Sequence, residues 1–357
     1  MSRPLILFDA WPRTPELIFD APTFARFEAL GEAVVARGGH LSVAEIEAAL
    51  PQATIIMGEI DLPAERLARA PNLKAIFNIS GNFGRNIDYD ACQKRGIYVL
   101  TGGTAFAVPV AEAALAMGID LARGISRHDR EFHDGRETWF HDGTRDCTFL
   151  FTGAPVGIIG YGDLGRALRG MLTPFQNAVK VYDPWVAEYL ITRDNCTPAT
   201  LEEVLATSRV IFVFASPTTE NQHFIGGAQL SLIQKHAAFV LMSRAAVVDF
   251  DELVRQVGEG RFNAAVDVFP QEPMPLDHPV RRLDGMLLSG HRTGGMTEAF
   301  HEIGRLVVGD AELVLRNLPP QLCRRGDANI APKFRDPTRR SSPEAIAGRA
   351  AAPKPTP

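Results

Sequence analysis

Cysteine is scarce in this sequence, and the few cysteines that it has lie far apart. Cys92, Cys147, Cys196 and Cys323 share no CxxC spacing, and no histidine stands near them in a zinc-ligand pattern. A disulfide framework would instead need several cysteines at close spacing in a short secreted chain. We therefore expect plain thiols, no bound metal and a reducing compartment.

An excess of positive charge and long apolar runs are also lacking. The formal net charge is -5 and the pI is near 6.0, and no basic stripe suggests a nucleic-acid partner. No apolar run approaches the ~20 residues of a membrane helix. The short apolar stretch at the start ends at Asp9, unlike that of a signal peptide. The sequence therefore predicts a cytoplasmic protein without nucleic-acid or membrane partners.

Short apolar runs alternate with helical patterns along most of the chain, which is typical of α/β folds with parallel sheets. In the first part we predict strands at 4–8, 54–57 and 74–79, and helices around 24–36 and 63–70. A longer amphipathic helix is predicted over 108–125, with Pro109 in its first turn. A polar loop is predicted to follow it over 127–145.

A second series of strands comes after this loop. Six strands are predicted, at 155–159, 179–183, 210–214, 239–242, 263–267 and 286–289, and a helix over 297–316 follows them. Six strands separated by helical segments match a doubly wound nucleotide-binding domain. From about Pro332 the chain has hardly any large apolar residue, so we expect 332–357 to be a disordered tail.

The strongest local signal is the segment VGIIGYGDLGRAL, in which Gly160, Gly162 and Gly165 form a GxGxxG motif between a strand and a helix. The first glycine permits a tight turn, the second lets the backbone approach a pyrophosphate, and the third allows close helix–strand packing. The helix N-terminus, with the N–H groups of Asp163 and Leu164, presents a positive dipole end to the phosphates. A structural turn is the alternative, but this position predicts a dinucleotide site.

The next predicted strand ends on Asp183. A carboxylate there can accept hydrogen bonds from both ribose hydroxyls of an adenosine, and it would repel a 2′-phosphate. The cofactor is therefore predicted to be NAD rather than NADP. The alternative is that Asp183 is only a solvated strand end.

Three later segments, LMSRAAVVDFDEL, AAVDVFPQEP and LLSGHRTGG, follow the glycine motif in that order. With it they resemble the D-isomer-specific 2-hydroxyacid dehydrogenases, which include the glycerate, lactate, glyoxylate/hydroxypyruvate and phosphoglycerate dehydrogenases. The resemblance covers about Lys74 to Asn317, and more faintly the segment before it. It implies an NAD-dependent oxidoreductase that interconverts D-2-hydroxy acids and 2-oxo acids, usually as a homodimer.

The resemblance also implies an architecture of two Rossmann-like domains. A doubly wound NAD-binding domain, 107–292, would be inserted in a smaller flavodoxin-like substrate domain made of 1–106 and 293–331. The active site of such proteins lies in the cleft between the two domains.

Carried over by position, the resemblance assigns the catalytic roles to Arg244, Glu272 and His291. A histidine suits proton transfer to a carbonyl oxygen, because the ordinary histidine pKa lies near neutrality. A carboxylate can fix the tautomer of that ring and stabilise the imidazolium. A guanidinium can bind the substrate carboxylate and polarise the carbonyl. Each residue alone favours a structural role, but the ordered set favours catalysis.

Further binding residues are implied by the same resemblance. Asp267 matches a position near the nicotinamide end of the cofactor, and Ser216 and Pro217 are expected to contact the cofactor as well. In the first domain, the backbone N–H groups of a loop after a strand would bind the substrate carboxylate. The loop residues are Ser80, Gly81 and Asn82, followed by Phe83. A simple strand-to-helix turn is the alternative for this loop.

Four positions depart from the family pattern. Ala245 stands where glycine is usual, Gly290 where proline is usual, Arg292 where small or apolar residues are commoner, and Arg85 where an acidic residue is usual. These departures leave the catalytic residues in place and bear on local geometry and specificity. The two arginines raise the hypothesis of a dianionic substrate, such as a phosphorylated or dicarboxylic acid.

Two other functions remain open at the level of sequence. Related proteins oxidise formate or phosphite, although the formate enzymes carry glutamine where this chain has Glu272. Other relatives are NAD-sensing corepressors that bind partner peptides without metabolic turnover, and they retain the same three catalytic positions. The sequence gives neither the particular 2-hydroxy acid nor the direction of the reaction.

Overall fold

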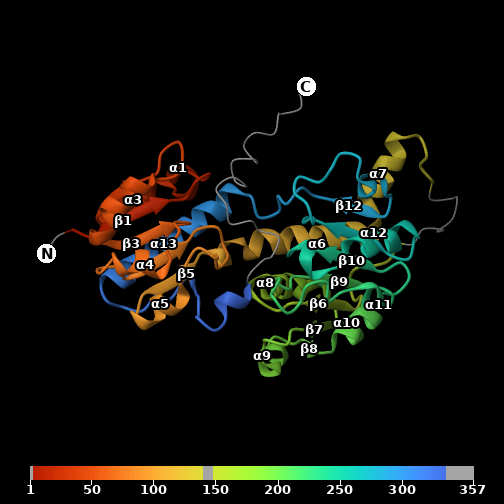
Figure 1. Ribbon diagram of the computed structural model, residues 1–357. Coiled ribbons are helices and arrows are strands. Elements are labelled where there is room, and N and C mark those ends of the chain that lie inside the picture. The colour runs from red at the N-terminus through yellow and green to blue at the C-terminus, as the bar shows by residue number, and fades with distance from the viewer. Residues whose placement is uncertain (1–2, 140–147, 335–357) are drawn as a thin grey trace. The chain divides into compact units, whose positions relative to one another are not determined.

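The computed structural model describes residues 3–139 and 148–334, and in it the chain divides into two compact units (Figure 1). Unit 1 consists of Met1–Phe106 and Met296–Pro357, and unit 2 consists of Ala107–Gly295. Unit 2 is therefore an insertion in unit 1. Each unit contains one largely parallel sheet, which confirms the predicted α/β fold with two parallel sheets. Beyond residue 334, the predicted tail lies outside the described residues, and its first residues belong to a 3-10 turn, η7 (Ala331–Phe334).

Unit 1 has a six-stranded sheet in the order β13-β5-β4-β3-β1-β2. β13 runs antiparallel to β5, and the other strands run parallel to their neighbours, in the flavodoxin-like order 2-1-3-4-5. The strands are β1 (Leu5–Asp9), β2 (Glu32–Val35), β3 (Ala53–Gly58), β4 (Ala75–Asn78), β5 (Tyr98–Thr101) and β13 (Arg324–Arg325). The helices are α1 (Pro15–Ile18), α2 (Ala21–Leu30), α3 (Val43–Ala49), α4 (Ala64–Ala68), α5 (Tyr89–Lys94) and α13 (Thr297–Leu315), with 3-10 turns η1 (Leu50–Gln52) and η2 (Gly103–Phe106).

The sheet of unit 1 has a buried layer on each face. Side chains alternate along a strand, so Leu7 of β1 packs in a cluster with Ile46 of α3 and Leu67 of α4. Its neighbour Phe8 packs on the other face, in a cluster that contains Ile303 of α13. The two faces of this sheet are thus covered by helices from distant parts of the sequence.

The predicted helix over 24–36 is wrong in its second half. α2 ends at Leu30, and residues 32–35 form the edge strand β2. The reason lies at Gly31, where an added Cβ would lie 2.1 Å from the carbonyl oxygen of Pro4. The chain is forced close to β1 at this point, and Glu32 N–H donates to Pro4 O at 2.9 Å, which begins the parallel pairing. β5 and β13 were not predicted either.

Unit 2 has a seven-stranded parallel sheet in the order β12-β11-β10-β9-β6-β7-β8. Counted from β6, the order contains the doubly wound arrangement 3-2-1-4-5-6. The strands are β6 (Val156–Ile159), β7 (Val179–Tyr182), β8 (Thr197–Pro198), β9 (Val210–Val213), β10 (Ala238–Leu241), β11 (Asn263–Val266) and β12 (Met286–Leu288). The helices are α6 (Ala107–Arg123), α7 (Ile125–His133), α8 (Asp163–Leu172), α9 (Glu188–Arg193), α10 (Leu201–Thr207), α11 (Gly227–Leu230) and α12 (Phe250–Gly258), with 3-10 turns η4 (Thr173–Phe175), η5 (Ala245–Val247) and η6 (Pro279–Arg282).

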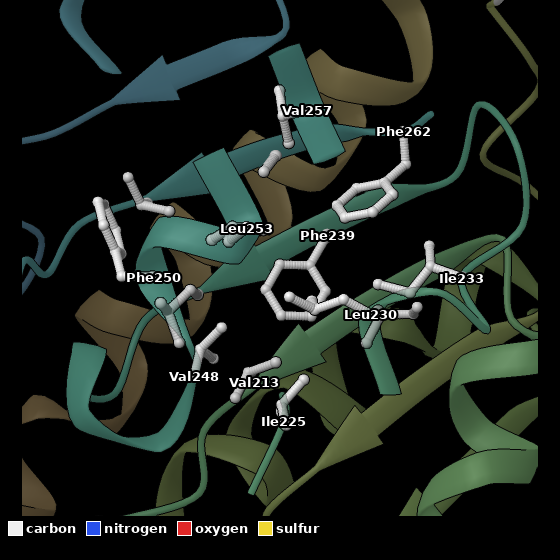
Figure 2. Close-up of a cluster of buried hydrophobic side chains, with 14 of the residues drawn as sticks. Val213, Ile225, Leu230, Ile233, Phe239, Val248, Phe250, Leu253, Val257 and Phe262 are labelled. Carbon is white, nitrogen blue, oxygen red and sulfur yellow. The ribbon is translucent and has the colours of Figure 1, made fainter. Parts of the chain in front are cut away.

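One buried cluster fixes the strands that carry the candidate site. Figure 2 shows side chains of β9, β10, α11 and α12 around Phe239, whose ring centroid lies 6.2 Å from that of Phe262. Leu253 and Val257 of α12 belong to the same cluster and are at most 4% exposed. Because such interiors are close-packed, this cluster holds β9 and β10 rigidly, and with them the loops that leave their carboxyl ends.

Two elements of unit 2 differ from the prediction. β8 was missed because two residues carry no readable periodicity. The predicted polar loop over 127–145 contains the end of α7, which has no buried residue and begins after Gly124 in a left-handed conformation (φ 66°). Residues 140–147 of that loop lie outside the described residues.

The segment Gly103–Arg123, which comprises η2 and α6, is long and apolar enough by length and composition to cross a membrane. This finding contradicts the expectation that no apolar run approaches that length. α6 packs against α8 and against β9, β10 and β11, and a Cβ added at Gly118 would lie 2.7 Å from Cζ of Phe212. Packing against α8 and the sheet of unit 2 accounts for the buried residues of this helix.

Candidate functional site

The turn after β6 shows what each glycine of the motif does. Gly160 has φ 94°, and an added Cβ would lie 2.4 Å from the amide nitrogen of Ala215. A Cβ at Gly165 would lie 2.6 Å from the carbonyl oxygen of Gly160. A Cβ at Gly162 would meet nothing within 4 Å. Packing thus requires a glycine at positions 160 and 165. At Gly162 there is open space beside the backbone, which suits the approach of a bound group.

Helix α8 begins directly at this open space. Its N-cap is Gly162, which provides no side-chain cap, and its first residues are Asp163 and Leu164. The first N–H groups of a helix have no partner within the helix, and its N-terminal end carries a positive dipole. The turn therefore fits the pyrophosphate of a dinucleotide, as the sequence predicts.

Asp183, at the end of β7, is tied to the same turn. Its Oδ2 accepts from Tyr161 N–H at 2.7 Å, and its Oδ1 accepts from Trp185 N–H at 2.9 Å. A carboxylate oxygen can accept more than one hydrogen bond, so these contacts are compatible with binding ribose hydroxyls. Asp183 thus braces the glycine turn in addition to its predicted role.

A pocket of about 470 Å³ lies beside Asp183. It is lined by the ends of β7 and β8, by the segment that follows β7, by residues of α9 and by the start of α10. The charged residues of its lining are all acidic: Asp183, Glu188, Glu202 and Glu203. A pocket of this size can take an adenosine, and its charge disfavours a 2′-phosphate.

The loop after β9 carries Ser216 and Pro217, the other predicted cofactor contacts. Asn221 holds the loop, because its Nδ2 donates to Ser216 O at 2.9 Å and its Oδ1 accepts from Thr218 N–H at 2.6 Å. The same loop pairs with the segment after β10, since His223 N–H donates to Ala246 O at 2.8 Å. The predicted cofactor loop and the segment that carries Arg244 are therefore joined.

His291 and Glu272 form a close pair. Nδ1 of His291 lies 2.8 Å from Oε2 and 3.0 Å from Oε1 of Glu272. Their side chains are 38% and 23% exposed, respectively. Oε1 of Glu272 also accepts from Phe269 N–H at 3.2 Å, which orients the carboxylate. With Nδ1 held in this way, Nε2 is the ring nitrogen left for a reacting group.

Arg244 reaches the same edge of the sheet by another strand. It follows β10 in extended conformation, and its Nη1 donates to Ser243 O at 2.6 Å. Because β10, β11 and β12 are adjacent parallel strands, Arg244, Glu272 and His291 all follow carboxyl ends on one side of unit 2. Ligands of open α/β sheets bind at that edge.

Asp267 has a role in the structure that the sequence did not indicate. It is 1% exposed, and both of its carboxylate oxygens accept hydrogen bonds from the segment after His291. Oδ1 accepts from Arg292 N–H at 3.0 Å, and Oδ2 accepts from the Thr293 hydroxyl at 2.6 Å. Its predicted position beside the nicotinamide stays a prediction.

The predicted substrate loop belongs to unit 1 and follows β4. Asn78, which is 1% exposed, shapes it, because its Oδ1 accepts from Ser80 N–H at 2.9 Å and from the Ser80 hydroxyl at 2.7 Å. Gly81 has φ 95°, and a Cβ there would lie 2.9 Å from the ring of Phe106. Asn82 is exposed. Sequence reasoning missed Asn78, although a polar residue that ends a buried strand is a readable signal.

Arg13 was also missed. It lies in the loop after β1, and its Nη1 donates to the carbonyl oxygen of Ile79, directly before the substrate loop, at 2.6 Å. Its guanidinium carbon lies 5.2 Å from the ring centroid of Phe300 and 6.0 Å from that of Phe106. A fixed positive charge therefore stands beside the loop that is predicted to bind an anion.

Comparisons with known proteins show which proteins this chain is similar to. The family model of the D-isomer specific 2-hydroxyacid dehydrogenase NAD binding domain matches residues 115–293. The chain is 30% identical over 280 residues to glyoxylate reductase of Thermofilum pendens, which covers 76% of this chain and 80% of that protein. It is 27% identical over 269 residues to D-3-phosphoglycerate dehydrogenase of Archaeoglobus fulgidus, which covers 75% of this chain and 50% of that protein. The crystal structure of a phosphoglycerate oxidoreductase from Rhizobium etli is similar with a TM-score of 0.81 and 41% identity, covering 91% of this chain and 99% of that one.

Proposed function

Because the chain belongs to the D-isomer specific 2-hydroxyacid dehydrogenases, we propose that His291 is its acid/base residue, that Glu272 is the partner of this histidine, and that Arg244 binds the substrate carboxylate and carbonyl. The observation that carries the proposal is the 2.8 Å contact between His291 Nδ1 and Glu272 Oε2. This pair lies at the edge of the sheet at which open α/β domains bind their ligands.

Family membership confirms the prediction of an NAD-dependent oxidoreductase that acts on small 2-hydroxy or 2-oxo acids. The relatives named above are reductases, dehydrogenases or oxidoreductases. The alternative of an NAD-sensing binding protein without turnover is therefore not favoured.

In the reductive direction, His291 donates a proton from Nε2 to the carbonyl oxygen of the 2-oxo acid. Glu272 holds Nδ1, so it fixes the ring orientation and stabilises the imidazolium before the transfer. Arg244 offers a planar pair of N–H donors to the substrate carboxylate and draws electron density toward the carbonyl oxygen. In the oxidative direction, neutral His291 accepts the same proton from the hydroxyl group.

Bound NAD supplies the exchange of a hydride with the α-carbon of the substrate. We assign its pyrophosphate to the turn with Gly160, Gly162 and Gly165 and to the N–H groups of Asp163 and Leu164. The open space at Gly162 supports this assignment. Asp183 is assigned to the adenosine ribose, and Ser216 and Pro217 to the neighbouring loop contact. The acidic lining of the pocket beside Asp183 supports NAD over NADP.

For the substrate, we assign the carboxylate to the loop of Ser80, Gly81 and Asn82. Gly81 and Asn82 offer backbone N–H groups there, while the Ser80 N–H donates to Asn78 and holds the loop. The two hydrogen bonds that Ser80 donates to Asn78 Oδ1 shape this loop and support the assignment. The relative with 41% identity is named a phosphoglycerate oxidoreductase, and Arg13 is anchored beside the loop. We therefore place the preferred acid among those with a second anionic group.

The test is oxidation of NADH with a panel of 2-oxo acids: glyoxylate, hydroxypyruvate, pyruvate, phenylpyruvate, 2-oxoglutarate and phosphohydroxypyruvate. The loss of NADH absorbance is measured for the wild type and for His291→Ala, with NADPH in parallel. Turnover of one acid that disappears in the variant is expected. Silence of the wild type toward every acid, with NADH bound, would contradict the assigned substrate class.

We also propose that the protein is a homodimer and that α7 contributes to the interface. Ile125 and Phe132, seven residues apart on α7, are 56% and 59% exposed, and Trp139, which contacts Phe132, is 57% exposed. Exposed apolar groups of this kind mark association surfaces. Light scattering on a size-exclusion column should give twice the 39.0 kDa mass of one chain, and Phe132→Glu should give the mass of a single chain.

We also propose a cytoplasmic location. The free thiols of Cys92, Cys196 and Cys323 support it.

A further inference from the structure

We propose that Thr293 is a positioning residue, whose hydroxyl, bound to the carboxylate of Asp267, holds the turn that presents His291. The inference rests on the proposed acid/base role of His291 and adds a residue that catalysis depends on without touching the substrate. It is carried by the hydrogen bonds of one buried carboxylate and by the backbone conformation of His291.

The turn joins two neighbouring strands. Ser289 N–H donates to Val266 O at 2.9 Å, which extends the pairing of β12 with β11 up to the residue before Asp267. After Gly290, the chain turns back at His291. From that point the backbone is held by Asp267, which accepts from Arg292 N–H at 3.0 Å and from Thr293 N–H at 3.4 Å.

His291 needs such support because its backbone is strained. Its φ is 55°, in the left-handed region that residues with a Cβ seldom adopt. A conformation of this kind persists only where the surroundings determine it. Gly290, directly before it, adds freedom rather than restraint, because a Cβ there would meet nothing within 4 Å. The restraint on the His291 backbone therefore comes from Arg292 and Thr293, the residues that follow it.

The hydroxyl of Thr293 is the strongest part of that restraint. Its Oγ1 donates to Oδ2 of Asp267 at 2.6 Å, the shortest of the three bonds to this carboxylate. Asp267 is 1% exposed, and a buried carboxylate depends on its donors. Loss of the hydroxyl would leave Oδ2 with the 3.4 Å bond from Thr293 N–H. The turn would then relax, and the imidazole would leave its position 2.8 Å from Glu272.

Thr293→Val tests the hydroxyl, because valine keeps the shape and the branching of threonine. We expect kcat to fall about 100-fold, the effect of a displacement of roughly 1 Å at a reacting group, while the Kd for NADH changes less than about twofold. Thr293→Ser keeps a hydroxyl and should retain at least about a third of the wild-type kcat.

Thr207→Val is the matched control, because its hydroxyl also donates a 2.6 Å bond, to Glu203 O on α10. It should leave kcat unchanged. If Thr293→Val does not fold, Thr293→Ala provides the same comparison with serine at lower steric demand. A wild-type kcat in Thr293→Val, or an equal loss of kcat in the valine and serine variants, would overturn the inference. Full activity of His291→Ala would instead overturn the proposed function.

Discussion

The carboxyl edges of the two sheets differ in what they present. In unit 2, three neighbouring strands end in side chains that can react or bind: Arg244, Glu272 and His291. In unit 1, the corresponding edge presents a backbone loop, which Asn78 shapes through two hydrogen bonds to Ser80. Chemistry that depends on side chains leaves residues in the sequence that can be recognised by type. Binding by backbone N–H groups leaves only glycines and a bracing residue.

The comparison is sharpest if each unit controls a different kinetic quantity. In unit 2, substitutions of His291, Glu272 and the glycine turn should affect kcat or the binding of NADH, whereas Arg244, which is assigned to the substrate, is outside this division. Substitutions at the edge of unit 1 should affect the KM for the acid. The following variants test this division.

The largest effect is expected for His291→Ala. Loss of the acid/base group should lower kcat/KM for the 2-oxo acid by about 10³-fold, with unchanged binding of NADH measured by fluorescence titration. Glu272→Gln keeps the shape and removes the charge, so a smaller loss of about 10- to 100-fold is expected. Activity of His291→Ala above a tenth of the wild type would remove the basis for its role.

The glycines of unit 2 provide the next test. Gly162→Ala places a methyl group where the structure has open space, so stability should be unchanged while NADH binds roughly tenfold more weakly. Gly165→Ala places it 2.6 Å from Gly160 O and should lower the free energy of unfolding by about 1–3 kcal/mol. Thermal melts and NADH titrations distinguish the two. Equal destabilisation by both variants would show that Gly162 is also required by packing.

The loop of unit 1 should respond through substrate binding. Asn78→Ala removes the acceptor for both Ser80 bonds, and a loop that loses them should raise the KM for the acid about tenfold. Ser80→Ala removes only the hydroxyl bond and should have less effect. The Kd for NADH is the control. A change in that constant, with KM unaltered, would break the division between the units.

A smaller effect is expected for Arg13→Gln, and only with some acids. Removing this charge should lower kcat/KM about fivefold to tenfold for an acid with two anionic groups, and by less than threefold for glyoxylate. Arg26→Gln, which loses an ion pair with Glu312 elsewhere in unit 1, is the matched control. Equal losses for both kinds of acid would assign Arg13 to the stability of the loop.

We expect none of the described cysteines to be alkylated, so the two units should not differ in this respect. Burial raises the pKa of Cys92 to about 12 and also raises the pKa of the Cys196 and Cys323 thiols. The thiolate is the reactive form, so these residues should stay unmodified by iodoacetamide near neutral pH. Mass spectrometry of the labelled peptides checks this, and modification of Cys92 would contradict its burial.

The sequence predicts the strands that end at the candidate site better than the edges of the sheets. β6, β9, β10 and β11 are mostly buried apolar runs, and β7 and β12, which are partly exposed, keep enough apolar residues for composition to identify them. β2 was predicted as helix because Glu32–Val35 continues a helical pattern, and only the contact of Gly31 with Pro4 ends it. β8 and β13 have two residues each, and they are strands only because they pair with β7 and β5.

A similar limit applies to the site. Motifs identify residues whose chemical type is required, such as the glycines after β6 and the pair His291 and Glu272. Thr293 and Arg13 are not identified from the sequence, because their importance depends on what lies beside them in three dimensions. Asp267 was assigned by position to the cofactor, and only the fold reveals its bonds to the turn after His291.

The insertion of unit 2 also has a consequence for the order in which a nascent chain can fold. Residues 107–295 are contiguous, so unit 2 is complete when they have left the ribosome. The packing of the unit 1 sheet is complete only after α13 has been synthesised, because Ile303 and Val307 of α13 pack in one cluster with Phe8 and Phe27. Until then this apolar face is covered only in part, by α1 and α2, which makes unit 1 the part that chaperones would hold during synthesis.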